Sequence, residues 1–210
     1  MTNLDPRYYA NARREIEPFL LFPIHSVLEI GCGEGNTLLW LRESKGVKIC
    51  RGLEILPAAA ERARGKGLDI AIGNVEVGGI PFQEKNDLVL CLDVLEHLHD
   101  PWKTLCCISD SIRSGGHLIV SIPNIAHISI LSDLIFNDDW KYAESGILDK
   151  THFRFFTSRT ARDLLSQAGL EVIQCKPKIV RKTHRRINFL TFHLFERFLT
   201  YQNLFLARKK

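Results

Sequence analysis

Short apolar runs alternate with helical segments along most of this chain. Seven runs have the length of strands and the apolar content that buried strands favour. In chain order they are Ser26–Ile30, Lys48–Glu54, Leu68–Ile72, Asp87–Leu92, His117–Ile122, Leu170–Cys175 and Asn203–Ala207. Because helices between successive strands favour a parallel sheet covered on both faces, we predict an α/β fold with a doubly wound, mostly parallel sheet of seven strands.

The helices expected between these strands have recognisable ends. One is expected to begin near Asn36, and another occupies 57–65. Asp100 followed by Pro101 predicts a third start, and Gly115-Gly116 is expected to stop that helix. Three-and-four spacing predicts its inward face as Trp102, Leu105, Cys106, Ser109 and Ile112.

Two connections are too long for simple alternation. Between them lies the last predicted helix. It is capped by Thr157 or Ser158 and ends at Gly169, with Leu164, Leu165 and Ala168 inward. The segment before it, 123–156, is expected to form a lid, because connections beyond about 12–15 residues usually carry function or local structure. The segment after it, 176–200, is basic and aromatic. We therefore predict one domain over 1–210 with two excursions.

Composition narrows the class of protein. The chain has 210 residues, of which 45% are hydrophobic and 25% charged, as in an ordinary soluble domain. No apolar run approaches the roughly 18 residues that span a bilayer, and the N-terminus lacks a signal-like apolar run, so a cytoplasmic location is expected. A net charge of +4 is too mild to favour a nucleic-acid partner. The six cysteines have no disulfide or metal-ligand spacing, which predicts free thiols and no metal.

The strongest chemical signal is a glycine loop after the first strand. Gly31, Gly33 and Gly35 permit a tight strand-to-helix turn and a close approach of a ligand to the backbone. Glu54 ends the second strand, where a carboxylate can accept both hydroxyls of a ribose. A dinucleotide fingerprint would need Gly or Ala at Asn36. The loop therefore indicates an adenosine-containing ligand other than a nicotinamide dinucleotide.

Acidic residues beside the loop specify the ligand further. Glu29 and Glu34 flank the glycines, where a pyrophosphate would need a positive helix end. Two carboxylates suit a ligand that carries a sulfonium and an ammonium group. The stretches VLEIGCGEG, GLEILP, IGNVE, NDLVLCLDVLEHLHDP and SGGHLIVSIPN together resemble the class I S-adenosylmethionine-dependent methyltransferases, in the small-molecule branch that includes the ubiquinone-biosynthesis type.

The resemblance covers about Tyr8 to Arg208 and implies a role for each matching position. It implies a last strand that is antiparallel and S-adenosyl-L-methionine as the cofactor. The implied cofactor-binding residues are Glu29, Gly31, Cys32, Gly33 and Gly35 for the methionine part, Glu54 for the ribose with Ile55 next to it, Asn74 and Val75 for the adenine, and Leu92 and Asp93 at the end of the fourth strand. Asn74 stands where the family usually has Asp. Tyr9 and Arg13 resemble the N-terminal helix that closes over the cofactor, or are surface helix residues.

Two histidines are candidates for the base that an oxygen nucleophile needs. His97 follows the fourth strand, and His152 lies in the D-K-T-H-x-R-F-F segment 149–156, which resembles glycan-associated methyltransferases. Asp149 and Arg154 are candidate substrate contacts, and Lys150 is an alternative clamp for an anionic group. In a purely structural reading, His97 fixes its loop and Asp149 pairs with Arg154 to pin the lid.

The excursion 176–200 has two readings. Six cations occur in eleven residues, 176–186, and a helical segment rich in Phe and Leu follows at 187–199. Basic residues beside an amphipathic aromatic helix favour a peripheral membrane contact; otherwise the helix packs on its own domain or on a dimer mate, so monomer and homodimer both stay open.

The leading hypothesis for the function is methylation of O or N of a small molecule, such as a sugar or lipid-linked intermediate. The second hypothesis is an RNA or protein methyltransferase, but the chain lacks the Asn/Asp-Pro-Pro-aromatic motif typical of enzymes that methylate amino groups of bases and glutamine. The third hypothesis is a non-catalytic cofactor-binding protein.

Overall fold

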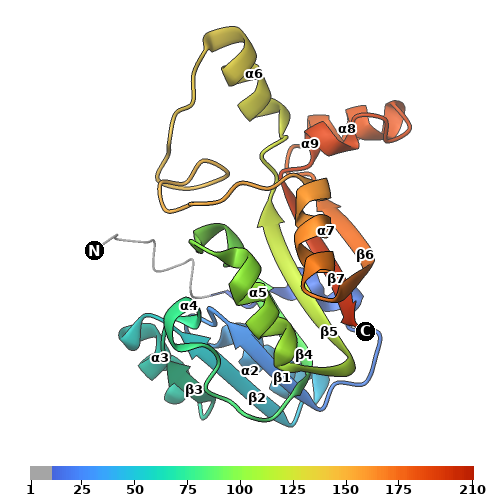
Figure 1. Cartoon of the computed structure of the whole chain (residues 1–210). Helices are drawn as coiled ribbons and strands as arrows, with labels where there is room; N and C mark the ends of the chain where they lie inside the picture. Colours follow the sequence, from blue (N-terminus) through green and yellow to red (C-terminus); the bar gives the residue numbers. More distant parts are fainter. Residues whose placement is uncertain (1–10) are drawn as a thin grey trace.

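The protein, described here by a computed structural model over residues 11–210, forms one seven-stranded sheet with helices on both sides (Figure 1). The strands are β1 (Ser26–Ile30), β2 (Ile49–Glu54), β3 (Asp69–Ile72), β4 (Asn86–Leu92), β5 (Ile112–Pro123), β6 (Leu170–Lys178) and β7 (Gln202–Lys209). The helices are the short 3-10 turns η1 (Arg14–Phe19) and η2 (Leu95–His97), with α2 (Asn36–Lys45), α3 (Pro57–Arg64), α4 (Val75–Gly78), α5 (Pro101–Asp110), α6 (Ile128–Asn137), α7 (Ser158–Gln167), α8 (Lys182–Leu190) and α9 (Glu196–Leu199).

The strand order confirms the predicted fold class. The order is β3-β2-β1-β4-β5-β7-β6, and β7 runs antiparallel to both β5 and β6. All five residues of β1 are buried because it is a central strand, with β2 on one side and β4 on the other. From β1 to β3 successive strands are added toward one edge of the sheet, and from β4 onward toward the other edge, so the strand order reverses between β1 and β4. Doubly wound sheets bind ligands in the crevice at such a point.

The core consists of two apolar layers, one on each face of the sheet. Alternate positions of β1 divide between them, with Leu28 and Ile30 in one layer and Val27 in the other. Helices α5 and α7 cover the first layer, and α2 and α3 cover the second. This packing holds the carboxyl ends of β1 and β4 side by side, since Ile30 pairs with Cys91.

The prediction for α5 was wrong at its C-terminus and for its inward face. The helix ends at Asp110, and Gly115-Gly116 lies within β5, which begins five residues earlier than predicted, at Ile112. A Cβ on Gly116 would lie 3.1 Å from the backbone oxygen of Asn86, so the glycine serves a close strand approach rather than a helix stop. Trp102 is 45% exposed, and the buried residues are Pro101, Thr104, Leu105, Ile108 and Ser109.

The excursion 123–156 leaves the sheet as α6 and returns as an irregular segment (Figure 1). None of the residues of α6 is buried. The return is attached to the domain, because the backbone N–H groups of Phe153 and Arg154 both donate to the carbonyl of Glu96. Helix α7 then begins at the predicted position with Thr157 as its cap in a capping box.

The excursion 176–200 starts later than its sequence suggests. Strand β6 extends to Lys178, and the helix begins at Lys182 rather than at Ile187. It is broken by a turn in which Phe192 and His193 adopt positive φ, so the aromatic segment forms two short helices. All six cysteines are free, as predicted. Within residues 11–210 no helix is long and apolar enough to cross a membrane.

Candidate active site

The glycine loop connects β1 to α2 in the crevice between β1 and β4. Gly31, Gly33 and Gly35 have φ values of +69°, +54° and +72°, a region that residues with a Cβ rarely adopt. The Gly31 N–H donates to the carbonyl of Leu53 over 2.8 Å, which ties the loop to β2. Gly35 is the N-cap of α2, and no side-chain hydrogen bond caps this helix end.

The two glycines at the ends of α2 give a matched test of this packing. Gly35 and Gly46 have nearly the same φ, +72° and +71°, but a Cβ at Gly35 would lie 2.4 Å from Leu68 Cδ1 whereas Gly46 faces open space. We expect Gly46→Ala to cost about 1–2 kcal/mol of unfolding free energy and Gly35→Ala to cost about 2–5 kcal/mol, because overpacking adds to the backbone strain. Urea denaturation measures both, and equal losses would contradict the packing argument.

Glu54 lies against the loop as the sequence predicts. The residue is 4% exposed. Its Oε2 accepts from the Gly33 N–H over 2.7 Å and its Oε1 from the Leu56 N–H over 2.9 Å. The next residue, Ile55, leaves 57% of its surface exposed at the same rim. The carboxylate is therefore held in place by backbone donors, beside an apolar surface that an adenosine can cover.

Cys32 contributes its backbone rather than its thiol. It is 7% exposed, and its Sγ lies so close to Gly52 that a Cβ there would be 2.5 Å away. Burial raises the pKa of the thiol, and the nearby carboxylates of Glu29 and Glu54 raise it further. The side chain is thus an apolar filler under the loop.

Glu29 presents a buried carboxyl at the end of β1. The residue is 3% exposed, and its Oε2 has no hydrogen-bond partner within the part of the chain that the structure describes. Burial raises its pKa to about 8, although Arg13 and a hydrogen bond from Thr37 act in the opposite direction. A cationic ligand group would supply the missing partner, which fits the ammonium group inferred from the sequence.

This buried carboxyl predicts a pH dependence of ligand binding. Because the folded-state pKa of Glu29 lies above the ordinary value of 4.5, the native state retains a proton that the unfolded chain loses, and the stability of the free protein falls as the pH rises from about 4.5 to 8. A cationic ligand favours the ionised form, so S-adenosylhomocysteine should bind more tightly as the pH rises from 6 to 8, by at most about tenfold per unit. Calorimetry at three pH values measures the slope, and Glu29→Gln should flatten it; an unchanged slope in the variant would assign it to another group.

Asn74 and Val75 occupy the rim near Glu54. Asn74 caps α4, and its Oδ1 accepts from the Glu76 N–H over 2.8 Å. The amide oxygen expected to meet the adenine amine is therefore already engaged with the helix, because a short helix start leaves its N–H groups without intrahelical partners. Val75 is 7% exposed and belongs to the apolar layer under this rim.

Asp93 is the centre of a polar network at the end of β4. It adopts φ +58°, directly after the buried Leu92. Its carboxylate accepts from Arg13 Nη1 over 2.9 Å, from Ser121 Oγ over 2.6 Å and from Gln202 Nε2. The network brings together the N-terminal segment, β5 and β7. Tyr9 lies outside the described residues.

The two candidate histidines lie next to each other. His97 ends η2, and His152 lies in the returning part of the excursion 123–156. Their ring centroids are 4.7 Å apart in an edge-to-face arrangement. His97 Nδ1 lies 3.1 Å from the carbonyl oxygen of Thr151, and His152 Nδ1 lies 3.0 Å from that of Ile147. Burial, together with the neighbouring His152, lowers the pKa of His97.

A surface pocket of about 490 Å³ opens beside His152. It is lined by Tyr142, Lys150, His152 and Phe153. Lys150 Nζ bonds to Glu144 at its rim. The excursion thus supplies the four lining residues, and His97 lies next to one of them, His152. The cofactor loop lies at the ends of β1 and β2.

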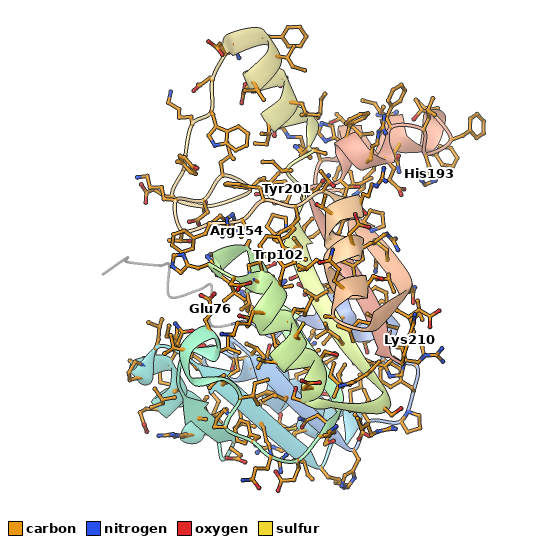
Figure 2. All side chains as sticks on the ribbon, in the orientation of Figure 1. Glu76, Trp102, Arg154, His193, Tyr201 and Lys210 are labelled. Carbon is orange, nitrogen blue, oxygen red and sulfur yellow. The ribbon has the colours of Figure 1, made fainter. Side chains whose placement is uncertain are left out.

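Asp149 and Arg154 do not pair with each other as the structural reading suggested. Asp149 Oδ1 accepts from the backbone N–H and hydroxyl of Thr151, at 2.8 and 2.7 Å. Arg154 donates twice to the carbonyl of His99 and stacks its guanidinium 5.6 Å from the Trp102 ring (Figure 2). Arg154 therefore fastens the returning segment to the domain, whereas Asp149 closes a turn within that segment.

Sequence reasoning overlooked several residues of this site. Glu96 is 1% exposed and lies between two predicted features, the fourth strand and His97. The available signal was that this charged residue directly follows the apolar pair Val94-Leu95. Ser121, Gln202 and Tyr142 carried no local signal, since each reaches the site through the fold.

Comparison with known proteins agrees with this geometry. A family model described as a methyltransferase domain matches residues 5–175. The chain is 31% identical over 106 residues to the ubiquinone biosynthesis O-methyltransferase of Vibrio atlanticus, covering 47% of this chain and 43% of that protein. It is 27% identical over 131 residues to the trans-aconitate 2-methyltransferase of Agrobacterium fabrum, covering 59% and 51%. The chain thus aligns with about half the length of these curated relatives.

The solved structures agree on the fold. A SAM-dependent methyltransferase from Archaeoglobus fulgidus superposes with a TM-score of 0.67 at 17% identity, covering 97% of this chain and 93% of that one. The chain combines this strand order and antiparallel β7 with a glycine loop that is held by Glu54. The family model covers most of the chain. The chain belongs to the class I S-adenosylmethionine-dependent methyltransferases.

Proposed function

We propose that this domain transfers a methyl group from S-adenosylmethionine to a hydroxyl oxygen of a small molecule. The observation that carries the proposal is the pair His97 and His152, whose rings are 4.7 Å apart beside the pocket of about 490 Å³. An alcohol or phenol oxygen is a poor nucleophile until its proton is removed, and imidazole is the side chain most often used for that purpose.

The proposed reaction is an in-line displacement. An oxygen lone pair attacks the methyl carbon, the carbon–sulfur bond breaks, and its electron pair returns to sulfur, leaving S-adenosylhomocysteine. The hydroxyl proton leaves toward the His97–His152 pair. Glu29, the glycine loop and Glu54 hold the cofactor, and Tyr142 and Phe153 line the pocket in which the acceptor is oriented.

Two kinds of observation support a small acceptor. The pocket has the volume of a metabolite site. The relative from Vibrio is named for the biosynthesis of ubiquinone and the relative from Agrobacterium for trans-aconitate, and both compounds are small molecules. A metabolite-library screen that detects S-adenosylhomocysteine should give hits among hydroxylated compounds. No hit in this screen together with turnover on RNA or protein in the same assay would overturn the proposal, and cofactor binding without turnover on any substrate would support the non-catalytic reading.

We also propose that the end of the molecule formed by α6, α8 and α9 contacts an anionic lipid surface. The two excursions meet there, with the rings of His127 and His184 5.6 Å apart, and project away from the sheet (Figure 1). Their exposed apolar residues include Ile135 (70%), Phe136 (82%), Phe189 (76%), Leu190 (72%), Phe192 (92%) and Leu194 (73%). The reading in which this helix packs on its own domain does not fit such exposure. Cations at positions 181, 182, 185 and 186 beside the apolar tip match an anionic surface.

The lipid contact predicts a specific loss in vesicle binding. We expect the full chain to co-sediment with vesicles containing phosphatidylserine, and the triple variant Phe189→Ser, Phe192→Ser, Leu194→Ser to bind at least about tenfold more weakly, because each exposed side chain contributes apolar burial. Val77→Ser on α4, which is 87% exposed, is the matched control. If the wild type does not bind the vesicles but forms a concentration-dependent dimer that the triple variant does not form, the apolar end of α6, α8 and α9 is a homodimer interface. The lipid proposal is then wrong.

A further inference from the structure

Three potential metal ligands meet behind the pocket. One ligand atom each from Glu96, His97 and His152 lies within 4.8 Å of the others. Glu96 and His97 come from η2, directly after β4, and His152 comes from the returning excursion more than fifty positions later. Ligands of one ion with bonds of about 2.1 Å lie up to about 4 Å apart, so the three ligand atoms lie near coordination distance.

The carboxylate of Glu96 has no hydrogen-bond partner among residues 11–210. The residue is 1% exposed, and among the described residues neither of its carboxylate oxygens has a hydrogen-bond donor. A buried carboxylate without donors is costly unless it pairs with a cation or coordinates a metal. Its backbone carbonyl is fully engaged, because it accepts from Phe153 and Arg154. The side chain is therefore held in position and left without a counterpart.

The two imidazoles are oriented as metal ligands usually are. Each places Nδ1 on a backbone carbonyl, His97 on Thr151 at 3.1 Å and His152 on Ile147 at 3.0 Å. A carbonyl only accepts, so Nδ1 carries the hydrogen and Nε2 keeps its lone pair. Metal-bound histidines in proteins typically donate their second N–H in this way. Asp149 supports the arrangement, since it fixes the turn that carries Thr151.

We propose that Glu96, His97 and His152 bind one divalent transition-metal ion, with the remaining coordination positions open toward the pocket. Two imidazoles and one carboxylate suit Mn²⁺, Fe²⁺, Co²⁺ or Zn²⁺ better than Mg²⁺ or Ca²⁺, which prefer oxygen ligands alone. The sequence predicted no metal because its cysteines have neither a C-x-x-C pair nor a histidine at metal-ligand spacing, and the third ligand of this cluster is distant in sequence.

The metal site deepens the proposed function, on which its catalytic role rests. A hydroxyl oxygen bound to the ion has a lower pKa and loses its proton to solvent near neutral pH. The metal-bound oxygen then attacks the methyl carbon, and the electron pair of the carbon–sulfur bond returns to sulfur. His97 and His152 thus promote deprotonation through the ion they hold, which replaces the direct proton transfer to imidazole described above. The favoured acceptors are those that offer a second oxygen to the same ion, such as vicinal diols, catechols and hydroxy acids.

Calorimetry on the full chain, stripped with a chelator and dialysed, tests the site without any substrate. We expect one equivalent of Mn²⁺, Co²⁺ or Zn²⁺ to bind, with Mg²⁺ much weaker, and Co²⁺ to develop the visible absorption of nitrogen ligation. Glu96→Gln, His97→Ala and His152→Ala should each lower the affinity by more than about 100-fold, and Asp149→Asn, which loosens only the supporting turn, by about 10–100-fold. His99→Ala is the matched control, because His99 is exposed on the same loop and stacks on Phe153.

Each outcome decides between the site and its absence. Failure of the wild type to bind any of these ions in saturable fashion would overturn the proposal, as would Co²⁺ spectra unchanged by Glu96→Gln and His152→Ala. The wild-type titration decides the matter even where a variant fails to fold. A parallel titration with S-adenosylhomocysteine separates the two proposals, because its binding without metal binding would leave the methyltransferase assignment intact, and metal binding alone would not rescue it.

Discussion

Replacing Glu54 with alanine should weaken S-adenosylhomocysteine binding more than any other single change at the cofactor site. We expect a loss of about 3 kcal/mol or more, roughly 200-fold in Kd, because a carboxylate that accepts two ribose hydroxyls makes two charge-assisted hydrogen bonds. The variant also releases the Gly33 N–H, which Glu54 Oε2 holds at 2.7 Å. Calorimetry measures the affinity, and urea denaturation shows how much of the loss reflects a disturbed loop.

Two further variants make this result specific. Glu54→Gln preserves the volume but offers only one acceptor oxygen, so an intermediate loss is expected. Glu61→Ala on α3 removes an exposed carboxylate that pairs with Arg64, and should leave binding unchanged. If Glu54→Ala binds within threefold of the wild type, the ribose does not lie against β2 and the assignment of the crevice is wrong.

The cofactor half of the site was predictable because its determinants are local. The glycines require positive φ at fixed spacing, and Glu54 ends a strand whose hydrophobic pattern is visible in the sequence. The strand runs were found for the same reason, since parallel strands covered on both faces are mostly apolar. Even the N-cap of α5 was predicted, because Asp100 accepts from the Lys103 N–H.

The acceptor half was only partly predictable because it is assembled across the fold. Gln202 reaches Asp93 across 109 positions, and Thr151 reaches His97 across 54. His97 and His152 were each chosen from local context, but their contact depends on how the excursion returns to Glu96. The inward face of α5 was misjudged for a related reason, since Trp102 packs under Arg154 of that returning segment instead of on the sheet.

His152→Ala should lower turnover by about 10²–10⁴-fold while leaving the affinity for S-adenosylhomocysteine within a few-fold of the wild type. The imidazole lines the acceptor pocket, and the cofactor contacts lie at the ends of β1 and β2. The assay is release of S-adenosylhomocysteine with the best hydroxylated hit of the metabolite screen. His99→Ala should retain turnover, because its imidazole lies outside the three-ligand cluster.

The double variant His97→Ala, His152→Ala should be no slower than the slower single variant. Residues that act as one unit lose their whole contribution when either is removed, whereas independent contributions multiply. Their rings are 4.7 Å apart, and each imidazole has its Nδ1 fixed by a backbone carbonyl of the same excursion. Multiplicative losses in the double variant would show that the two histidines act separately. A non-additive result together with unchanged cofactor affinity would place the deprotonation of the acceptor at this pair.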